Sequence, residues 1–119
     1  MLADFDHDGD LDAVMTRSNG ELQLFRNNGS GEFTPWNGIT LSSGQLGHPV
    51  VGDFNNDGNM DIVCASRTSD VIMVIKTNAN GTLQSPQVLP FDSIPYEVAV
   101  EDFDSNGFLD IVAVSRETN

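Results

Sequence analysis

Short apolar runs, separated by small polar residues, make up most of the chain. The clearest runs are DAVMT from Asp12, ELQLFR from Glu21, DIVCAS from Asp61, DVIMVIK from Asp70 and DIVAVS from Asp110. They are rich in Val and Ile and are bounded by Gly, Asn, Asp and Ser, which is typical of β-strands. No segment carries an apolar stripe of helical period over about ten residues. The pattern therefore predicts an all-β chain.

The same arrangement recurs along the chain. DFDHDGDLD begins at Asp4, DFNNDGNMD at Asp53 and DFDSNGFLD at Asp102, so both steps are 49 residues. Such a period is typical of repeat architectures with about four short strands per unit. We predict a first repeat over residues 1–48 with a truncated first strand and a loop at 4–12, a complete second repeat over 49–97 with a loop at 53–61, and a third over 98–119 that has only its first two strands and a loop at 102–110.

One strand indicates how the repeats are arranged. VIMVI, from Val71 to Ile75, is apolar on both faces and must be covered on both sides. A four-stranded antiparallel sheet stacked between two similar sheets, as in a β-propeller blade, meets that need. Closed propellers have about four to eight blades, and 119 residues supply about two and a half. We therefore expect either a segment of a longer propeller, which we favour, or several chains that assemble to complete one.

The charge is strongly acidic and unevenly placed. Eighteen acidic residues oppose five basic ones, for a net charge of -13, and eleven of the eighteen lie within the three repeated loops. Nucleic acids and anionic membrane surfaces require basic patches, so we expect neither as a partner. No apolar stretch approaches the roughly 20 residues that span a bilayer, so we expect no membrane insertion. The single cysteine, Cys64, is expected to be a buried apolar side chain.

The repeated loops have the spacing of calcium ligands. Ca²⁺ prefers six to eight hard oxygen ligands, and D-x-[DN]-x-[DN]-G turns alternate side chains inward around a tight turn at Gly9, Gly58 and Gly107. We predict up to three Ca²⁺ ions. Their ligands are Asp4, Asp6, Asp8, the Asp10 carbonyl and Asp12 in the first loop; Asp53, Asn55, Asp57, the Asn59 carbonyl and Asp61 in the second; and Asp102, Asp104, Asn106, the Phe108 carbonyl and Asp110 in the third.

An EF-hand shares the first six loop positions but requires a Glu at position 12 and flanking helices. Met15, Cys64 and Ala113 occupy that position on predicted strands, so the EF-hand interpretation fails in all three loops. The crowded aspartates repel one another unless a divalent cation lies among them. Three Ca²⁺ ions would change the net charge from -13 to -7. The first loop offers the most carboxylates, so we expect it to bind Ca²⁺ most tightly.

DFDHDGDLDAV, GDFNNDGNMDIV and EDFDSNGFLDIV resemble the calcium loops of the FG-GAP/VCBS repeat family, which builds integrin-α-like β-propellers. The resemblance implies that each loop joins the first and second strands of a blade. It also implies a secreted or cell-surface protein used in adhesion or protein recognition. The chain lacks the Phe-Gly and Gly-Ala-Pro sequences that name the FG-GAP form, so it looks closer to the VCBS form. No signal peptide is visible at its start.

Other functions have less support in the sequence. Ser, His and Asp residues are present, but no nucleophile, base and orienting group are brought together, so we expect no enzymatic activity from this chain. His7 and His48 are expected to be solvent-exposed. A carbohydrate-binding propeller is an alternative, with Trp36 and Tyr96 as candidate stacking platforms. A non-catalytic accessory segment of a larger secreted enzyme is a second alternative.

Overall fold

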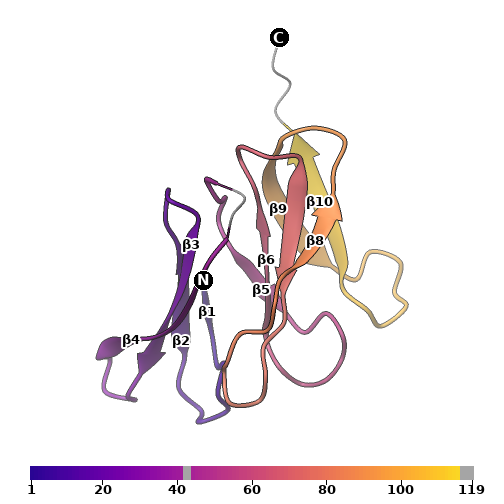
Figure 1. The fold of residues 1–119 in the computed structure, drawn as a ribbon. Helices are drawn as coiled ribbons and strands as arrows, with labels where there is room; N and C mark the ends of the chain where they lie inside the picture. The colour runs from indigo at the N-terminus through magenta and orange to yellow at the C-terminus, as the bar shows by residue number, and fades with distance from the viewer. Residues whose placement is uncertain (42–43, 116–119) are drawn as a thin grey trace.

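The computed structural model describes residues 1–41 and 44–115. Successive strands of each sheet run in opposite directions (Figure 1). The described ranges contain no helix, and accordingly none that could cross a membrane. The strands are β1 (Leu2–Ala3), β2 (Asp12–Thr16), β3 (Glu21–Asn27), β4 (Phe33–Thr40), β5 (Val50–Gly52), β6 (Asp61–Ala65), β7 (Val71–Ile75), β8 (Gln87–Pro90), β9 (Pro95–Glu101) and β10 (Asp110–Ser115). The prediction of an all-β chain is confirmed.

The strands form three antiparallel sheets in chain order. The first sheet is β1-β2-β3-β4, the second is β5-β6-β7-β8, and the third consists of β9 and β10. Equivalent registers link them, because Ala3 pairs with Asp12, Gly52 with Asp61 and Glu101 with Asp110. The sheets lie side by side in Figure 1 and do not close into a ring over the described residues. The fold is therefore a set of propeller-type blades that make up part of a propeller.

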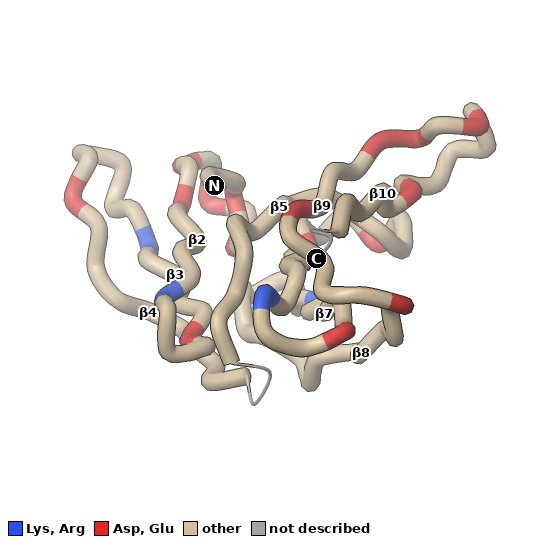
Figure 2. Tube along the Cα trace, turned by 90° about the horizontal axis from the view of Figure 1, so that it is seen from above, with Lys and Arg blue, Asp and Glu red and all other residues tan. Residues whose placement is uncertain are grey.

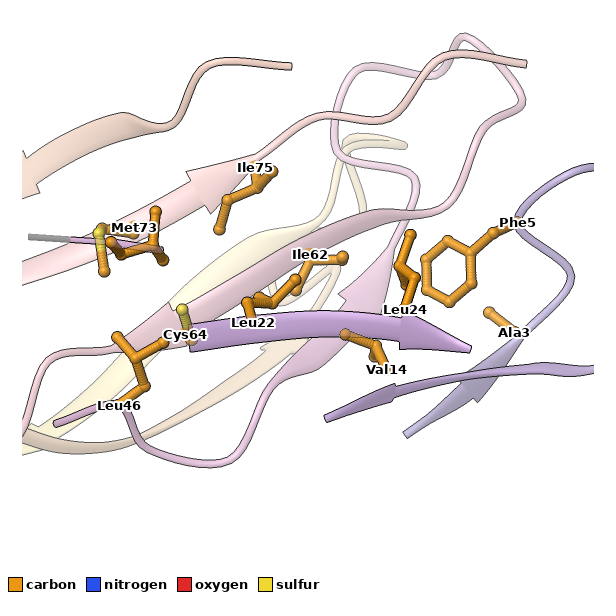
Figure 3. Packing of buried hydrophobic residues seen from close by; sticks show 11 residues of the cluster. Ala3, Phe5, Val14, Leu22, Leu24, Leu46, Ile62, Cys64, Met73 and Ile75 are labelled. Atoms are coloured by element: carbon orange, nitrogen blue, oxygen red, sulfur yellow. The ribbon is translucent and has the colours of Figure 1, made fainter. Parts of the chain in front are cut away.

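Two apolar layers hold the sheets together. Between the first and second sheets, alternate side chains of β2 and β3 face those of β6 and β7 (Figure 3). This cluster contains Ala3, Phe5, Val14, Leu22, Leu24, Leu41, Leu46, Ile62, Cys64, Met73 and Ile75. Between the second and third sheets lie Val63, Ala65, Ile72, Val74 and Val98, against which Ile111 and Ala113 pack. Each buried Leu, Ile, Val or Phe side chain contributes about 1.5–3 kcal/mol to such a layer.

The second sheet is buried on both faces, as the apolar run from Val71 to Ile75 predicted. All five residues of β6 are buried, and so are four of the five in β7. Successive side chains on a strand point to opposite faces, so one set packs on the first sheet and the other on the third. The outer strands β4 and β8 are mostly exposed, which explains why their sequences show little apolar pattern.

Candidate metal centres

The three aspartate loops occupy equivalent places in the three sheets. They connect β1 to β2, β5 to β6 and β9 to β10, which are the first two strands of each sheet, as the resemblance implied. All three project from the lower side of the sheets in Figure 1. Acidic residues mark the loop between β9 and β10 in the view of Figure 2, where basic residues are few. The fold thus presents the three candidate sites along one edge.

Two positions in each loop have a left-handed backbone. Gly9, Gly58 and Gly107 have φ values of 92°, 88° and 88°. A Cβ atom added at any of them would meet nothing within 4 Å, so backbone conformation rather than crowding favours glycine. Two residues earlier, the non-glycine residues His7, Asn56 and Ser105 have φ values of 61°, 55° and 60°. The sequence pattern predicts the glycine turn but not this earlier one, because three different residue types occupy it.

Backbone amides hold the inward side chains in the same way in every loop. The carboxylate at the first loop position accepts a hydrogen bond from the turning glycine, and the side chain at the fifth position accepts one from the amide of the seventh. The first of these bonds joins Gly9 to Asp4 at 3.1 Å, Gly58 to Asp53 at 2.8 Å and Gly107 to Asp102 at 2.8 Å. The second joins Asp10 to Asp8 at 3.0 Å, Asn59 to Asp57 at 2.8 Å and Phe108 to Asn106 at 2.8 Å.

The first loop brings three carboxylates together. One oxygen from each of Asp4, Asp6 and Asp8 lies within 4.8 Å of the other two. Asp4 Oδ1 is buried and has no hydrogen-bond partner among the described residues. An unpaired buried oxygen on a charged group is costly, and a cation among the three carboxylates would remove that cost. These oxygens therefore fit a metal ion.

A basic side chain already contacts this cluster. Arg26 Nη2, from β3, lies 2.7 Å from Asp6 Oδ2 and 3.1 Å from Asp8 Oδ2. The Asp10 amide and then the Arg26 guanidinium hold the pKa of Asp8 below its ordinary value. The guanidinium thus supplies part of the positive charge that a metal ion would supply. No sequence pattern predicts the contact of Arg26 with this cluster, because Arg26 lies 18 residues from Asp8 and only the strand register brings the two together.

The aspartates at the ninth loop position are fully buried in the first two repeats. Asp12 accepts hydrogen bonds from the Phe5 amide at 3.2 Å and the Asn27 amide at 2.9 Å. Asp61 accepts one from the Thr77 amide at 2.9 Å, while its Oδ2 is buried with no partner among the described residues. Burial raises the pKa of both carboxyl groups. These residues therefore connect each loop to the end of the third strand of its sheet.

The remaining predicted ligands are distributed differently in the second and third loops. Asp102, Asp104 and Asp110 each place one oxygen within 4.8 Å of the others. In the second loop, Asn55 Nδ2 instead donates a hydrogen bond of 2.8 Å to Asp57 Oδ2. The Asn59 amide holds the pKa of Asp57 below its ordinary value. The first and third loops thus each hold a three-carboxylate cluster, whereas the described residues of the second loop form no such cluster.

The donor set itself limits which metal fits. The two three-residue clusters contain only carboxylates, with no His or Cys, and hard oxygen ligands suit Ca²⁺ or Mg²⁺ rather than zinc. Asp4, whose Oδ1 is buried and unpaired, belongs to the first of these clusters, where such a cation would satisfy it. The residues present therefore fit a hard divalent cation.

The two candidate aromatic platforms are engaged in contacts within the chain. Trp36 is half-buried and lies against Gly81, where an added Cβ atom would come within 1.8 Å of the ring. The Arg67 guanidinium lies 4.4 Å from the centroid of the Tyr96 ring. The carbohydrate-binding alternative stays a prediction, and neither ring provides a specific observation in its favour.

Antiparallel four-stranded sheets in series, each with the same loop between its first two strands, define a β-propeller-type repeat module. The sequence model of the FG-GAP-like repeat matches residues 4–64 and 53–113. The chain therefore belongs to the FG-GAP-like repeat family. The two matches begin 49 residues apart, which is the spacing of the loops themselves. Comparison with curated proteins and with solved structures gave no match.

Proposed function

We propose that the chain is a calcium-binding β-propeller repeat module whose Ca²⁺ ions are structural. Each ion would be held by the first, third and fifth side chains of a loop, with the carbonyls of Asp10, Asn59 and Phe108 and the aspartates at the ninth position completing the oxygen shell. Bound Ca²⁺ would neutralise the carboxylates and fix the loop between the first two strands of each sheet. Mg²⁺ prefers a rigid octahedron and retains its waters, so it would compete poorly.

The observation that carries this proposal is the cluster of Asp4, Asp6 and Asp8 oxygens, in which Asp4 also has a buried, unpaired Oδ1. Burial of a carboxylate with one oxygen unsatisfied is unfavourable by about 1–3 kcal/mol or more. Desolvation favours the protonated form, and Asp53 and Asp57 lie close enough to add to the rise in the pKa of Asp61. A divalent cation between these carboxylates would reverse the repulsion. The same spacing of Asp, Asn and Gly residues occurs in three loops, which favours one shared purpose over three separate acidic turns.

The wider role we propose is extracellular adhesion or protein–protein recognition, without catalysis. Free Ca²⁺ is plentiful outside cells, and sites built on exposed loops suit that environment. The loops and sheet edges would provide the recognition surface, since binding residues concentrate on loops held by a rigid scaffold. A remaining part of a longer propeller, or further chains, would complete the module.

Thermal unfolding with and without Ca²⁺ tests the structural role. Each occupied site should add about 2.7 kcal/mol to the free energy of unfolding at a hundredfold excess over its Kd. Asp61→Asn should remove the share that belongs to the second loop. Asp92→Asn, an exposed aspartate outside the loops, serves as the matched control and should keep the full gain. An equal gain in both variants would contradict the assignment of Asp61 to a calcium site.

A further inference from the structure

Hydrogen bonds cross from one aspartate loop to the next at two places. His7 Nε2 of the first loop lies 3.0 Å from Asn59 Oδ1 of the second loop, 52 residues away. Asn56 Nδ2 of the second loop donates to the Gly107 carbonyl of the third loop at 3.0 Å, 51 residues away. An amide oxygen can only accept, so His7 carries a hydrogen on Nε2. The three loops are therefore connected in series at the lower side of the sheets (Figure 1).

Both donors occupy the fourth position of their loops and share an uncommon backbone. His7 and Asn56 have φ values of 61° and 55°. This left-handed conformation is unfavourable for most residues, and Asn and His adopt it more often than most. Ser105 has the same conformation at the same position of the third loop, and within the described residues it makes no hydrogen bond to another loop. The left-handed residue thus leaves the fourth side chain outside the ligand set of its own loop, where it can contact a neighbouring one.

The bond from Asn56 holds a peptide group that also positions a proposed ligand of the third loop. The Gly107 carbonyl and the Phe108 amide belong to the same planar peptide group. The Phe108 amide donates a hydrogen bond of 2.8 Å to Asn106 Oδ1. Asn106 is the proposed fifth-position ligand. Fixing the direction of the Gly107 carbonyl therefore also fixes the amide that orients Asn106.

The bond from His7 acts on the seventh position of the second loop. The carbonyl of Asn59 is a proposed ligand, and its backbone amide donates to Asp57 Oδ1 at 2.8 Å. Asn59 is therefore held from within by Asp57 of its own loop, and from outside by His7 of the first loop. In both cases the side chain at the fourth position of one loop restrains the sixth or seventh position of the next.

We propose that His7 and Asn56 are positioning residues for the loop of the following repeat, and that they make Ca²⁺ binding at successive loops cooperative. The calcium part of this inference rests on the proposed function. A loop that is already restrained loses less conformational freedom when it binds an ion, so its affinity is higher. Coupling between two binding sites is reciprocal, so a filled second loop favours filling of the first as much as the first favours the second.

Charge couples the loops as well, but with the opposite sign. A loop that has taken up a divalent cation is less negative, so it attracts the next cation less strongly toward its neighbour. Salt screens this effect over a Debye length of about 8 Å at physiological ionic strength. Hydrogen bonds between the loops predict positive cooperativity that remains when salt is added, and charge alone predicts negative cooperativity that fades.

The test is a Ca²⁺ titration of the full chain followed by NMR at physiological salt. The backbone amides of Gly9, Gly58 and Gly107 report the three loops separately, because each donates to the first aspartate of its own loop. Asn56→Ser should raise the Ca²⁺ concentration at half occupancy of the third loop by about two- to tenfold, which is the effect of one hydrogen bond. His7→Ser should do the same at the second loop. The spread of the amide resonances shows whether each variant is folded.

The substitutions are chosen to keep the backbone. Serine already adopts the left-handed conformation at Ser105, so it should keep this turn in place of His7 or Asn56 while being too short to reach the next loop. Ser105→Asn is the matched control and should leave all three titrations unchanged. A variant combining Asp4→Asn and Asp6→Asn disables the first loop. It should weaken the second loop more in the wild-type background than in the His7→Ser background, which a general loss of stability would not produce.

A measurement without calcium separates the positioning role from the proposed function. In the calcium-free chain, Asn56→Ser should speed the exchange of the Phe108 amide with solvent by a similar two- to tenfold. A wild-type chain that binds no Ca²⁺ would overturn the proposed function and the cooperativity, while the exchange rate would still decide the positioning role. Unchanged titrations of both variants, in a chain that does bind Ca²⁺, would overturn this inference alone. Equal weakening of all three loops by either variant would also overturn it.

Discussion

Phe5 and Phe103 hold the same place in the repeat but should contribute very differently to stability. Phe5 is 1% exposed in the layer between two sheets, and truncating such a side chain costs about 3–5 kcal/mol. Phe103 is 59% exposed, so Phe103→Ala should change the free energy of unfolding by about 0.5 kcal/mol or less. Phe54, which is partly buried, should lie between them. The expected order of cost is therefore Phe5, then Phe54, then Phe103.

Urea unfolding of the three alanine variants measures this order. Trp36 is the single tryptophan and packs against the layer between the first two sheets, so its fluorescence follows their separation. Far-UV circular dichroism follows all the sheets, and agreement between the two signals tests two-state unfolding. Phe5→Leu and Phe103→Leu provide a milder pair if Phe5→Ala does not fold.

Equal costs for Phe5→Ala and Phe103→Ala would refute the reasoning. That result would mean that the third sheet is covered in solution as well as the first, or that the layer between the first two sheets is not packed as described. A larger cost at Phe103 would contradict the order of the sheets itself.

Three further variants test single features. Arg26→Gln should tighten Ca²⁺ binding at the first loop several-fold by calorimetry, because the guanidinium competes for Asp6 and Asp8; weaker binding would show that Arg26 supports the site. Gly58→Ala should lower the free energy of unfolding by about 1–2 kcal/mol, because alanine is strained at a φ of 88°. The added Cβ atom would meet nothing within 4 Å, so the cost comes from the backbone conformation alone. Burial raises the pKa of Cys64 to about 12, so its thiol should resist thiol reagents until the chain unfolds. Because the unfolded thiol ionises first, stability should fall between about pH 9 and pH 12, and Cys64→Ala should lack that part of the fall.

The sequence predicted the strands and their stacking because both depend on local patterns. The apolar run from Val71 to Ile75 required cover on both faces, and β7 is buried on both. The spacing of 49 residues placed the loops in equivalent positions. Strand β4 was harder to predict, because most of its side chains are exposed and its sequence contains Pro35 and Gly38.

The parts of the candidate site that the sequence did not reveal depend on contacts between distant residues. Arg26 reaches Asp6 only because β3 pairs with β2 in one particular register. The Asn27 amide donates a hydrogen bond to Asp12, and the Thr77 amide donates one to Asp61. The two donors are equivalent in the repeats, but they are different residue types 50 positions apart. A comparison of identical residues in the repeats therefore does not reveal that Asn27 and Thr77 are equivalent. The hydrogen bonds that Asp12 accepts from the Phe5 and Asn27 amides likewise became visible only in the structure.

The most direct measurement of the central claim is the number of Ca²⁺ ions bound per chain, determined by equilibrium dialysis with Mg²⁺ present in excess. The proposed sites predict up to three ions per chain, with the number reduced by one in a variant that combines Asp102→Asn and Asp104→Asn. Binding of no Ca²⁺ by the folded chain, or binding that this double substitution leaves unchanged, would contradict the assignment of the aspartate loops as calcium sites.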